Sequence, residues 1–123
     1  MGAVKIIGAV PDERVVTFIN HLVQKYPLDR DTIFQFDDSV NFTYEGCPCK
    51  GLAYPRSNRA RVATRWPVKE VIYYVAHEYK HLLQAHAGAT FNKSEIRQME
   101  DDASNFGLRE RKAAIEEGII EFT

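Results

Sequence analysis

The sequence contains no long uninterrupted run of apolar residues. Its apolar stretches are only a few residues long, such as residues 6–10, whereas a membrane-spanning helix needs roughly 18 to 20. The N-terminus also lacks a basic region followed by a long apolar run and a cleavage site, which together mark a secretory signal. We therefore expect a protein without a membrane partner, located in the cytoplasm.

An excess of charge of either sign is also missing. Lysine and arginine together number 16 and the acids 17, which leaves a formal net charge of −1. This balance argues against a protein that coats nucleic acid and against a polybasic membrane anchor. With 45% apolar and 11% aromatic residues, the chain is too hydrophobic to be disordered. Its length predicts a single domain over residues 1–123.

Cysteine is scarce: the only two are Cys47 and Cys49, separated by Pro48. Cysteines this close rarely form a disulfide that closes a useful loop, and no second pair is present to complete a zinc ribbon. We expect two ordinary reduced thiols in a turn around Pro48.

Charge is nevertheless distributed unevenly along the middle of the chain. Residues 29–45 carry five acids and one base, and residues 50–69 carry six bases and no acid. We expect two oppositely charged surfaces of one sheet. The alternative is that residues 50–69 bind an acidic protein or nucleic acid, although no recognised nucleic-acid motif accompanies the bases.

Hydrophobic spacing predicts an α+β fold with a small, mostly antiparallel sheet packed on an N-terminal helix and two C-terminal helices. Residues 32–36 and 40–44 are rich in β-branched and aromatic residues around a turn-forming Asp37-Asp38-Ser39, which predicts a hairpin. The remaining expected elements are strands at 4–10, 52–54 and 61–64, and helices at about 11–26, 67–88 and 93–117.

The second of these helices contains the motif His-Glu-x-x-His, formed by His77, Glu78 and His81. Residues four apart lie one turn apart on the same helix face, so the two imidazoles can converge on one metal ion. Glu78 lies beside that face and is available to accept a proton from a metal-activated water. The spacing therefore predicts a catalytic metal site.

A catalytic zinc needs a third protein ligand and one open position. The third predicted helix supplies Glu100, Asp101 and Asp102 in succession. Successive side chains on a helix turn by about 100°, so these three cannot all point the same way. Ala103 and Phe106 are expected to face inward, with Asp102 flanking them. The residues alone leave the choice among the three acids open.

His77-Glu78-Tyr79-Lys80-His81 followed by Asp102-Ala103-Ser104-Asn105-Phe106-Gly107 resembles the gluzincin metallopeptidases. The chain is especially similar to minimal zincin domains of the ImmA/IrrE type, and the resemblance covers mainly residues 61–107. In that family, the helix that follows the active-site helix carries a pattern close to Glu-Ala-x-x-Phe-Ala, whose Glu is the third zinc ligand. The matching position here is Asp102, which the resemblance ranks first and Glu100 second. The chain departs from the pattern in having Asp in place of Glu and Gly107 in place of Ala.

The resemblance implies a zinc-dependent metallopeptidase that hydrolyses peptide bonds of a narrow protein substrate. Zn²⁺ would be bound by His77, His81 and Asp102, and Glu78 would act as general base. Such proteases hold an extended substrate on an exposed edge strand, for which we expect Arg61, Val62, Ala63 and Thr64, with basic flanks that favour acidic peptides. The alternatives are an inactive zincin-fold module that binds protein or DNA through residues 50–69, and a protease recruited to DNA.

Two further groups near the motif are weighed from spacing alone. A phenol that stabilises an oxyanion could come from Tyr73, Tyr74 or Tyr79. Tyr74, three residues before His77, is nearest its face, although we expect a packing role. His86 lies five residues after His81, about 140° further around the helix, and is expected to point away from the metal into solvent.

Overall fold

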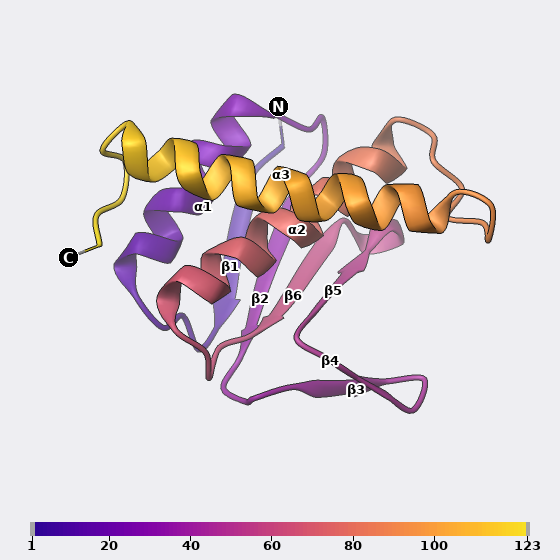
Figure 1. Ribbon diagram of the computed structural model, residues 1–123, viewed down its shortest axis with the longest axis horizontal. Coiled ribbons are helices and arrows are strands. Elements are labelled where there is room, and N and C mark those ends of the chain that lie inside the picture. Colours follow the sequence, from indigo (N-terminus) through magenta and orange to yellow (C-terminus); the bar gives the residue numbers. More distant parts are fainter. Residues whose placement is uncertain (1, 123) are drawn as a thin grey trace.

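A four-stranded sheet forms one side of the molecule in the computed structural model, which describes residues 2–122 (Figure 1). The order across the sheet is β1 (Val4–Gly8), β2 (Thr32–Asp37), β6 (Arg59–Ala63) and β5 (Gly51–Tyr54). β2 pairs in parallel with both β1 and β6, and only β5 is antiparallel to its neighbour, β6. The expected mostly antiparallel sheet is therefore wrong. The reason is that α1 (Glu13–Lys25) crosses over between β1 and β2, which leaves those strands parallel.

The hairpin predicted from residues 32–36 and 40–44 is also wrong. Both edges of β2 are occupied by β1 and β6, so β3 (Phe42–Tyr44) pairs instead with β4 (Cys47–Cys49) in a separate two-stranded sheet. The turn between them is Glu45-Gly46, with φ angles of 49° and 79°, the positive values that a tight hairpin requires. The two free cysteines thus lie in a strand and not in a turn.

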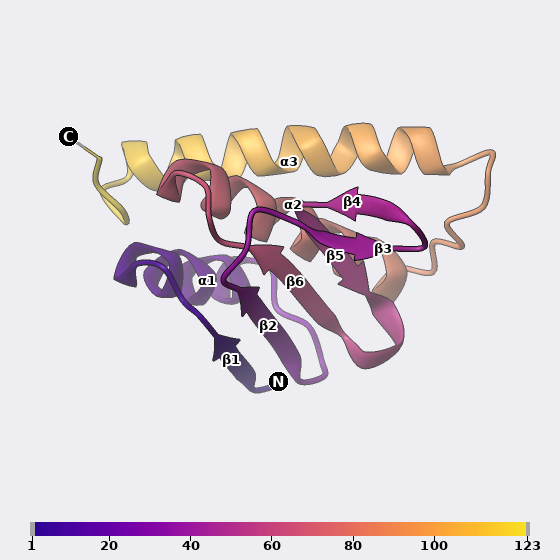
Figure 2. The same cartoon turned by 90° about the horizontal axis from the view of Figure 1, so that it is seen from below.

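The helices α1 and α2 cover one face of the four-stranded sheet, and α3 lies on α2, in line with the α+β prediction (Figure 2). α1 begins after Asp12, whose side chain accepts a hydrogen bond from the backbone N–H of Arg14 at 2.8 Å. α2 (Val68–His86) follows β6, and α3 (Ile96–Glu116) crosses over it. A short 3₁₀ turn, η1 (Pro55–Ser57), joins β5 to β6. Within residues 2–122 no helix is long and apolar enough to cross a membrane.

The helix α2 is sandwiched between the sheet and α3, which Figure 2 shows edge-on. Its inner face packs on the sheet through Tyr79, whose ring lies 5.8 Å from that of Phe34. Its other face receives Phe106 of α3, which is 1% exposed. Because α2 contacts both layers, the side chains along it are held on two sides, and the predicted metal-binding motif is part of the core.

The outer face of the sheet carries the charged residues of the middle of the chain. The Nε of Arg61 donates to Oδ2 of Asp37 at 2.7 Å, and the Nε of Arg65 donates to Oδ1 of Asp38 at 3.0 Å. The acids of residues 29–45 and the bases of residues 50–69 therefore pair with one another, and the expected separation into two oppositely charged surfaces is wrong at these positions.

Candidate metal centre

The two histidines of the motif converge on the side of α2 that faces α3. The ring centroids of His77 and His81 are 4.9 Å apart. One potential ligand atom from each of His77, Glu78 and His81 lies within 4.8 Å of the others. Helical spacing therefore brings the three side chains together as predicted, and the group could hold a metal ion.

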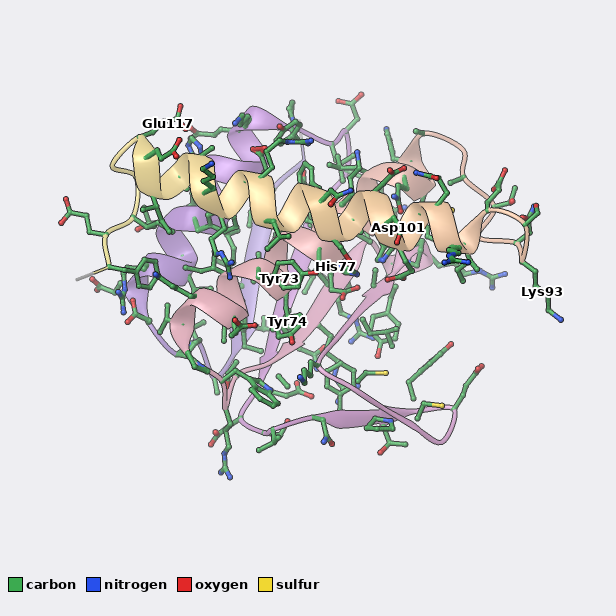
Figure 3. The ribbon with its side chains drawn as sticks, in the orientation of Figure 1. Tyr73, Tyr74, His77, Lys93, Asp101 and Glu117 are labelled. Atoms are coloured by element: carbon green, nitrogen blue, oxygen red, sulfur yellow. The ribbon has the colours of Figure 1, made fainter. Side chains whose placement is uncertain are left out.

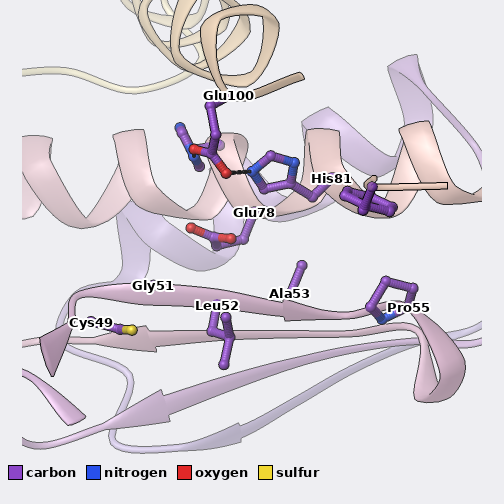
Figure 4. Close-up of a pocket in the computed structure, with 10 residues that line it drawn as sticks. Cys49, Gly51, Leu52, Ala53, Pro55, Glu78, His81 and Glu100 are labelled. Carbon is purple, nitrogen blue, oxygen red and sulfur yellow. Dashed lines mark hydrogen bonds and ion pairs between the residues drawn. The ribbon is translucent and has the colours of Figure 1, made fainter. Parts of the chain in front are cut away.

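The carboxylate that contacts both histidines belongs to Glu100 of α3. Its Oε2 lies 3.1 Å from Nε2 of His77, and its Oε1 lies 2.9 Å from Nε2 of His81. In Figure 4 this side chain descends from α3 toward His81, while Glu78 lies between α2 and the strand that carries Gly51. Two imidazoles and one carboxylate thus meet between α2 and α3.

The structure does not place Asp102, ranked first from the sequence, at this centre. Asp102 is exposed, and its Oδ1 accepts a hydrogen bond from Nε2 of Gln98 at 2.9 Å, one turn earlier on α3. Asp101 is exposed as well and forms no ion pair with either histidine within residues 2–122 (Figure 3). The buried face of α3 includes Gly107, seven residues after Glu100 and therefore on the same side of the helix. That side lies against α2, which is why Glu100 is the acid that reaches the histidines.

A second hydrogen bond defines which nitrogen of His81 carries the proton. The amide Nε2 of Gln84 donates to the backbone oxygen of Met99 at 3.0 Å, so its Oε1 must be the acceptor 2.8 Å from Nδ1 of His81. The Nδ1 of His81 therefore donates, and in the neutral ring Nε2 has a free lone pair. This Nε2 is buried and, within residues 2–122, forms no hydrogen bond, although Oε1 of Glu100 lies 2.9 Å from it. A bare nitrogen lone pair facing the carboxylate of Glu100 is the arrangement that a cation between them satisfies.

His77 is held from its other side by Tyr73. The phenol oxygen of Tyr73 lies 3.4 Å from Nδ1 of His77, one helical turn away. The tyrosine expected from spacing, Tyr74, makes no such contact, and its ring lies beneath the ammonium of Lys50. Burial lowers the pKa of His77 below its ordinary value, a positive charge on His81 would lower it further, and Glu100 opposes the shift. The ring is therefore neutral at neutral pH, which is the state in which imidazole binds metal.

Glu78 lies in a buried position between α2 and the first residue of β5. Its side chain is 6% exposed. Burial, together with the negative charge of Glu100, raises the pKa of Glu78 to about 8. A Cβ at Gly51 would lie 2.7 Å from Oε2 of Glu78, so the absence of a side chain at position 51 gives the carboxyl group its space. Glycine at the start of β5 was not identified as part of the site from the sequence.

A pocket of about 510 Å³ opens in front of these groups. Its floor is β5, and its walls are the motif, the loop before α3 and Cys49 (Figure 4). The strand expected to hold the substrate, Arg61–Thr64, does not border it, because β6 pairs with β2 on one side and β5 on the other. That expectation is corrected: β5 is the edge strand at the pocket, and within residues 2–122 its outer edge has no paired strand.

Several residues of the site were missed or misjudged from the sequence. Gln84 was missed, and Tyr73 was considered but placed after Tyr74; each lies one turn from a histidine of the motif, and that spacing was the signal that could have identified their contacts. Phe91 lines the pocket from the loop before α3, with its ring 5.9 Å from that of His81, and no sequence pattern marked it. His86 is exposed, as expected.

Comparison of the chain with models of protein families, with curated proteins and with solved structures finds no match in any of the three. The resemblance to minimal zincins accordingly stays a prediction from residues 61–107, and the function is argued below from the site itself.

Proposed function

We propose that this protein is a zinc-dependent metallopeptidase whose metal is held by His77, His81 and Glu100. The observation that carries the proposal is the buried Nε2 of His81, which faces the carboxylate of Glu100 at 2.9 Å while Nδ1 of the same ring is bonded to Gln84. Without a cation or an added proton, the buried nitrogen of His81 would face the partly exposed carboxylate of Glu100 as one electron-rich group against another.

The donor set suits zinc. Two imidazole nitrogens and one carboxylate are a ligand set that catalytic zinc sites use, and it leaves one coordination position open. When bound there, Zn²⁺ supplies Lewis acidity and lowers the pKa of a coordinated water toward roughly 7. The ligands come from two different helices, and Gln84 links them by contacting His81 and the backbone of Met99, next to Glu100.

Glu78 would move the protons of the reaction. Its carboxylate would take a proton from the attacking water as the water oxygen bonds to the peptide carbonyl carbon. It would then give that proton to the amide nitrogen as the C–N bond breaks, which releases a carboxylate and an amine. Burial, which raises the pKa of Glu78 to about 8, favours the proton-holding state that this second step requires. The nearby metal charge would favour the ionised state that the first step requires.

A chain of hollows along β5 supports an extended peptide as substrate. A hollow of about 290 Å³ beside Tyr73 and Tyr74 shares Gly51, His77 and Glu78 with the central pocket. A third, of about 440 Å³, shares Pro55 and Phe91 with it on the other side. The free edge of β5 runs beside the central pocket and offers backbone groups to a peptide strand. This arrangement favours a polypeptide over a compact small molecule.

The test is metal content by elemental mass spectrometry, combined with peptide cleavage, on protein purified without a histidine tag. We expect about one zinc per chain in wild type and loss of zinc in His81→Ala and Glu100→Ala. Zinc should be kept in Asp102→Asn, the control acid two residues after Glu100 on the same helix. Glu78→Gln should keep zinc and lose cleavage of a mixed peptide library. Absence of zinc in wild type after reconstitution would overturn the proposal, and so would unchanged cleavage by Glu78→Gln.

The alternative of an inactive module that binds nucleic acid through residues 50–69 has less support. Arg61 and Arg65 are paired with acids of the same chain. Lys50 lies over the ring of Trp66 at 4.1 Å, so much of the charge in this segment is already engaged. DNA binding that weakens steeply with added salt would favour this alternative.

A further inference from the structure

The hollow of about 440 Å³ beside the central pocket has a distinct chemical character. It lies between η1, the last turn of α2 and the loop before α3, and its lining includes Arg30, Arg56 and His86 but no acidic residue. Pro55 and Phe91 line both this hollow and the central pocket. We refer to it as the basic hollow. A peptide lying along β5 could therefore reach it without leaving the groove.

The guanidinium of Arg30 is fixed at the basic hollow by uncharged partners. Its Nη2 donates to the backbone oxygen of Arg56 at 2.8 Å, and its Nη1 donates to that of Pro55 at 3.3 Å. The neighbouring acid, Asp31, is directed elsewhere and accepts a hydrogen bond from the backbone N–H of Ala3. Within residues 2–122 neither Arg30 nor Arg56 forms an ion pair. Arg30 and Arg56 thus both line the basic hollow, and no carboxylate of the described residues neutralises either of them.

This situation contrasts with that of the other bases in residues 50–69. Arg61 and Arg65 are neutralised by Asp37 and Asp38. The guanidinium of Arg59 lies over the ring of Tyr54 at 4.2 Å and donates to Gln35. Among the described residues, Arg56 differs from these bases in having neither an ion pair nor an aromatic ring beneath its guanidinium, and it lies beside the groove. Charge placed in this way selects ligands of opposite sign.

The wall between the two hollows is held in an unusual conformation. Phe91 has a φ angle of 56°, in the left-handed region that bulky residues seldom adopt. Its ring packs at 5.9 Å against His81 and so separates the candidate metal ligands from the basic hollow. Backbone strain of this kind concentrates at ligand-binding sites. The position of Phe91 makes the basic hollow a compartment next to the reacting groups and not a distant surface feature.

We infer that the basic hollow is a specificity subsite that binds a carboxylate of the peptide, through the guanidinium groups of Arg30 and Arg56. The carboxylate comes either from an Asp or Glu side chain near the scissile bond or from the C-terminus of the peptide. The inference rests on the proposed function only in taking the ligand to be a peptide. Guanidinium groups match the planar geometry of a carboxylate and form charge-assisted hydrogen bonds with it.

The test is a binding measurement that does not require cleavage. Isotope-labelled, zinc-loaded Glu78→Gln protein is titrated with N-acetylated alanine-rich hexapeptides and followed by NMR. One peptide contains Glu and ends in an amide, one contains Gln and ends in an amide, and one contains Gln and ends in a free carboxylate. We expect about tenfold tighter binding of whichever charged peptide supplies the carboxylate, with amide shifts at residues 55–58 and 85–91.

Substitutions then assign the effect to the basic hollow. Arg56→Gln should abolish the preference for charge while leaving binding of the neutral peptide unchanged. Arg30→Gln should do the same if the fold is intact. Arg65→Gln, which removes the same charge from the same segment away from the groove, should leave the preference in place. The preference should also weaken as salt is added.

Equal binding of the three peptides would overturn the inference, and so would a preference that survives both Arg56→Gln and Arg30→Gln. The outcome is separable from that of the proposed function. A protein that binds charged peptides at the basic hollow but cleaves nothing would overturn the peptidase and keep the subsite. A protein that cleaves neutral and acidic peptides equally well would overturn the subsite and keep the peptidase.

Discussion

The carboxyl group of Glu78 occupies the space in which a side chain at position 51 would begin. A Cβ on Gly51 would lie 2.7 Å from Oε2, 3.0 Å from Cγ and 3.2 Å from Cδ of Glu78. A strand residue and the proposed general base are therefore mutually dependent. The conformation of Gly51 is not unusual, so the glycine is required by contact and not by backbone geometry.

The first prediction concerns this contact. Gly51→Ala should displace the carboxylate of Glu78 and lower kcat/KM by about 100-fold, because misplacement of a reacting group by about 1 Å has that effect. Zinc content should be unchanged. Gly51→Ala should also destabilise the fold, because its methyl group meets the Glu78 side chain. In that background, Glu78→Asp should recover part of the lost stability, since the shorter side chain withdraws from the new methyl group. Full activity of Gly51→Ala would show that Glu78 does not act from the position described.

The second prediction concerns Gln84. Gln84→Leu removes the acceptor for Nδ1 of His81. The ring is then no longer held in one orientation, and the proton is no longer kept on Nδ1 and away from Nε2. We expect zinc affinity to fall by about 10- to 100-fold, the range seen when groups that orient metal ligands are removed. Competition with a chelator of known affinity measures the change. Gln98→Leu, on the exposed side of α3, is the control and should bind zinc as wild type does.

The third prediction concerns the packing of α3 on α2. A Cβ at Gly107 would lie 2.9 Å from ring atoms of Tyr73 and 3.2 Å from its backbone oxygen. Gly107→Ala should therefore destabilise the protein by about 1–3 kcal/mol, although alanine is favoured in a helix by about 1 kcal/mol. Denaturant unfolding tests this, and Asn105→Ala, exposed on the same helix, should be neutral or stabilising. A stabilised Gly107→Ala would mean that the two helices are less closely packed than described.

The fourth prediction concerns stability in acid. Burial alone would raise the pKa of Glu110, but hydrogen bonds from Lys25 and Tyr26 outweigh it and hold that pKa below the ordinary 4.5. The unfolded chain then binds a proton more readily than the folded one. The stabilisation from Glu110 is complete above the ordinary pKa and is lost as the pH falls through the folded value.

Glu110→Gln should accordingly lower the free energy of unfolding at neutral pH by on the order of 1 kcal/mol, a modest amount because Lys25 is partly exposed. The difference from wild type should shrink as the pH falls below the ordinary value of 4.5 and through the lowered folded pKa of Glu110. Unfolding in urea at a series of pH values provides the measurement. Glu116→Gln is the control, since Glu116 is exposed and its ion pair with Lys112 is long, at 3.9 Å. A difference that grows in acid would contradict the assignment.

The helices and the convergence of the motif could be predicted from the sequence because both depend on local spacing. His77 and His81 are one turn apart in any helix, so no tertiary information is needed to bring them together. The sheet could not be predicted in the same way. The composition of residues 32–36 is compatible with pairing to residues 40–44 as well as to β1 and β6. The observed pairing of β2 with β1 and β6 is decided by the α1 crossover and by burial of Phe34 and Phe36.

The choice of third carboxylate shows where local reasoning ends. Ala103 and Phe106 were identified correctly as inward residues, and both are buried. The direction in which α2 lies across that inward face depends on the close contact of Gly107 with Tyr73, and this contact brings the side of Glu100 to the histidines. A single glycine in the pattern, noted as a departure from the family, was thus the informative residue.

The placement of the candidate ligands on two helices also has a consequence for biosynthesis. His77 and His81 lie on α2, whereas Glu100 belongs to α3, the last helix of the described chain. During translation the histidines emerge first, and the carboxylate can join them only after much of α3 has left the ribosome and docked. The candidate ligand set would thus be completed only after α3 has been synthesised, so that a chain halted before α3 carries the motif without its carboxylate.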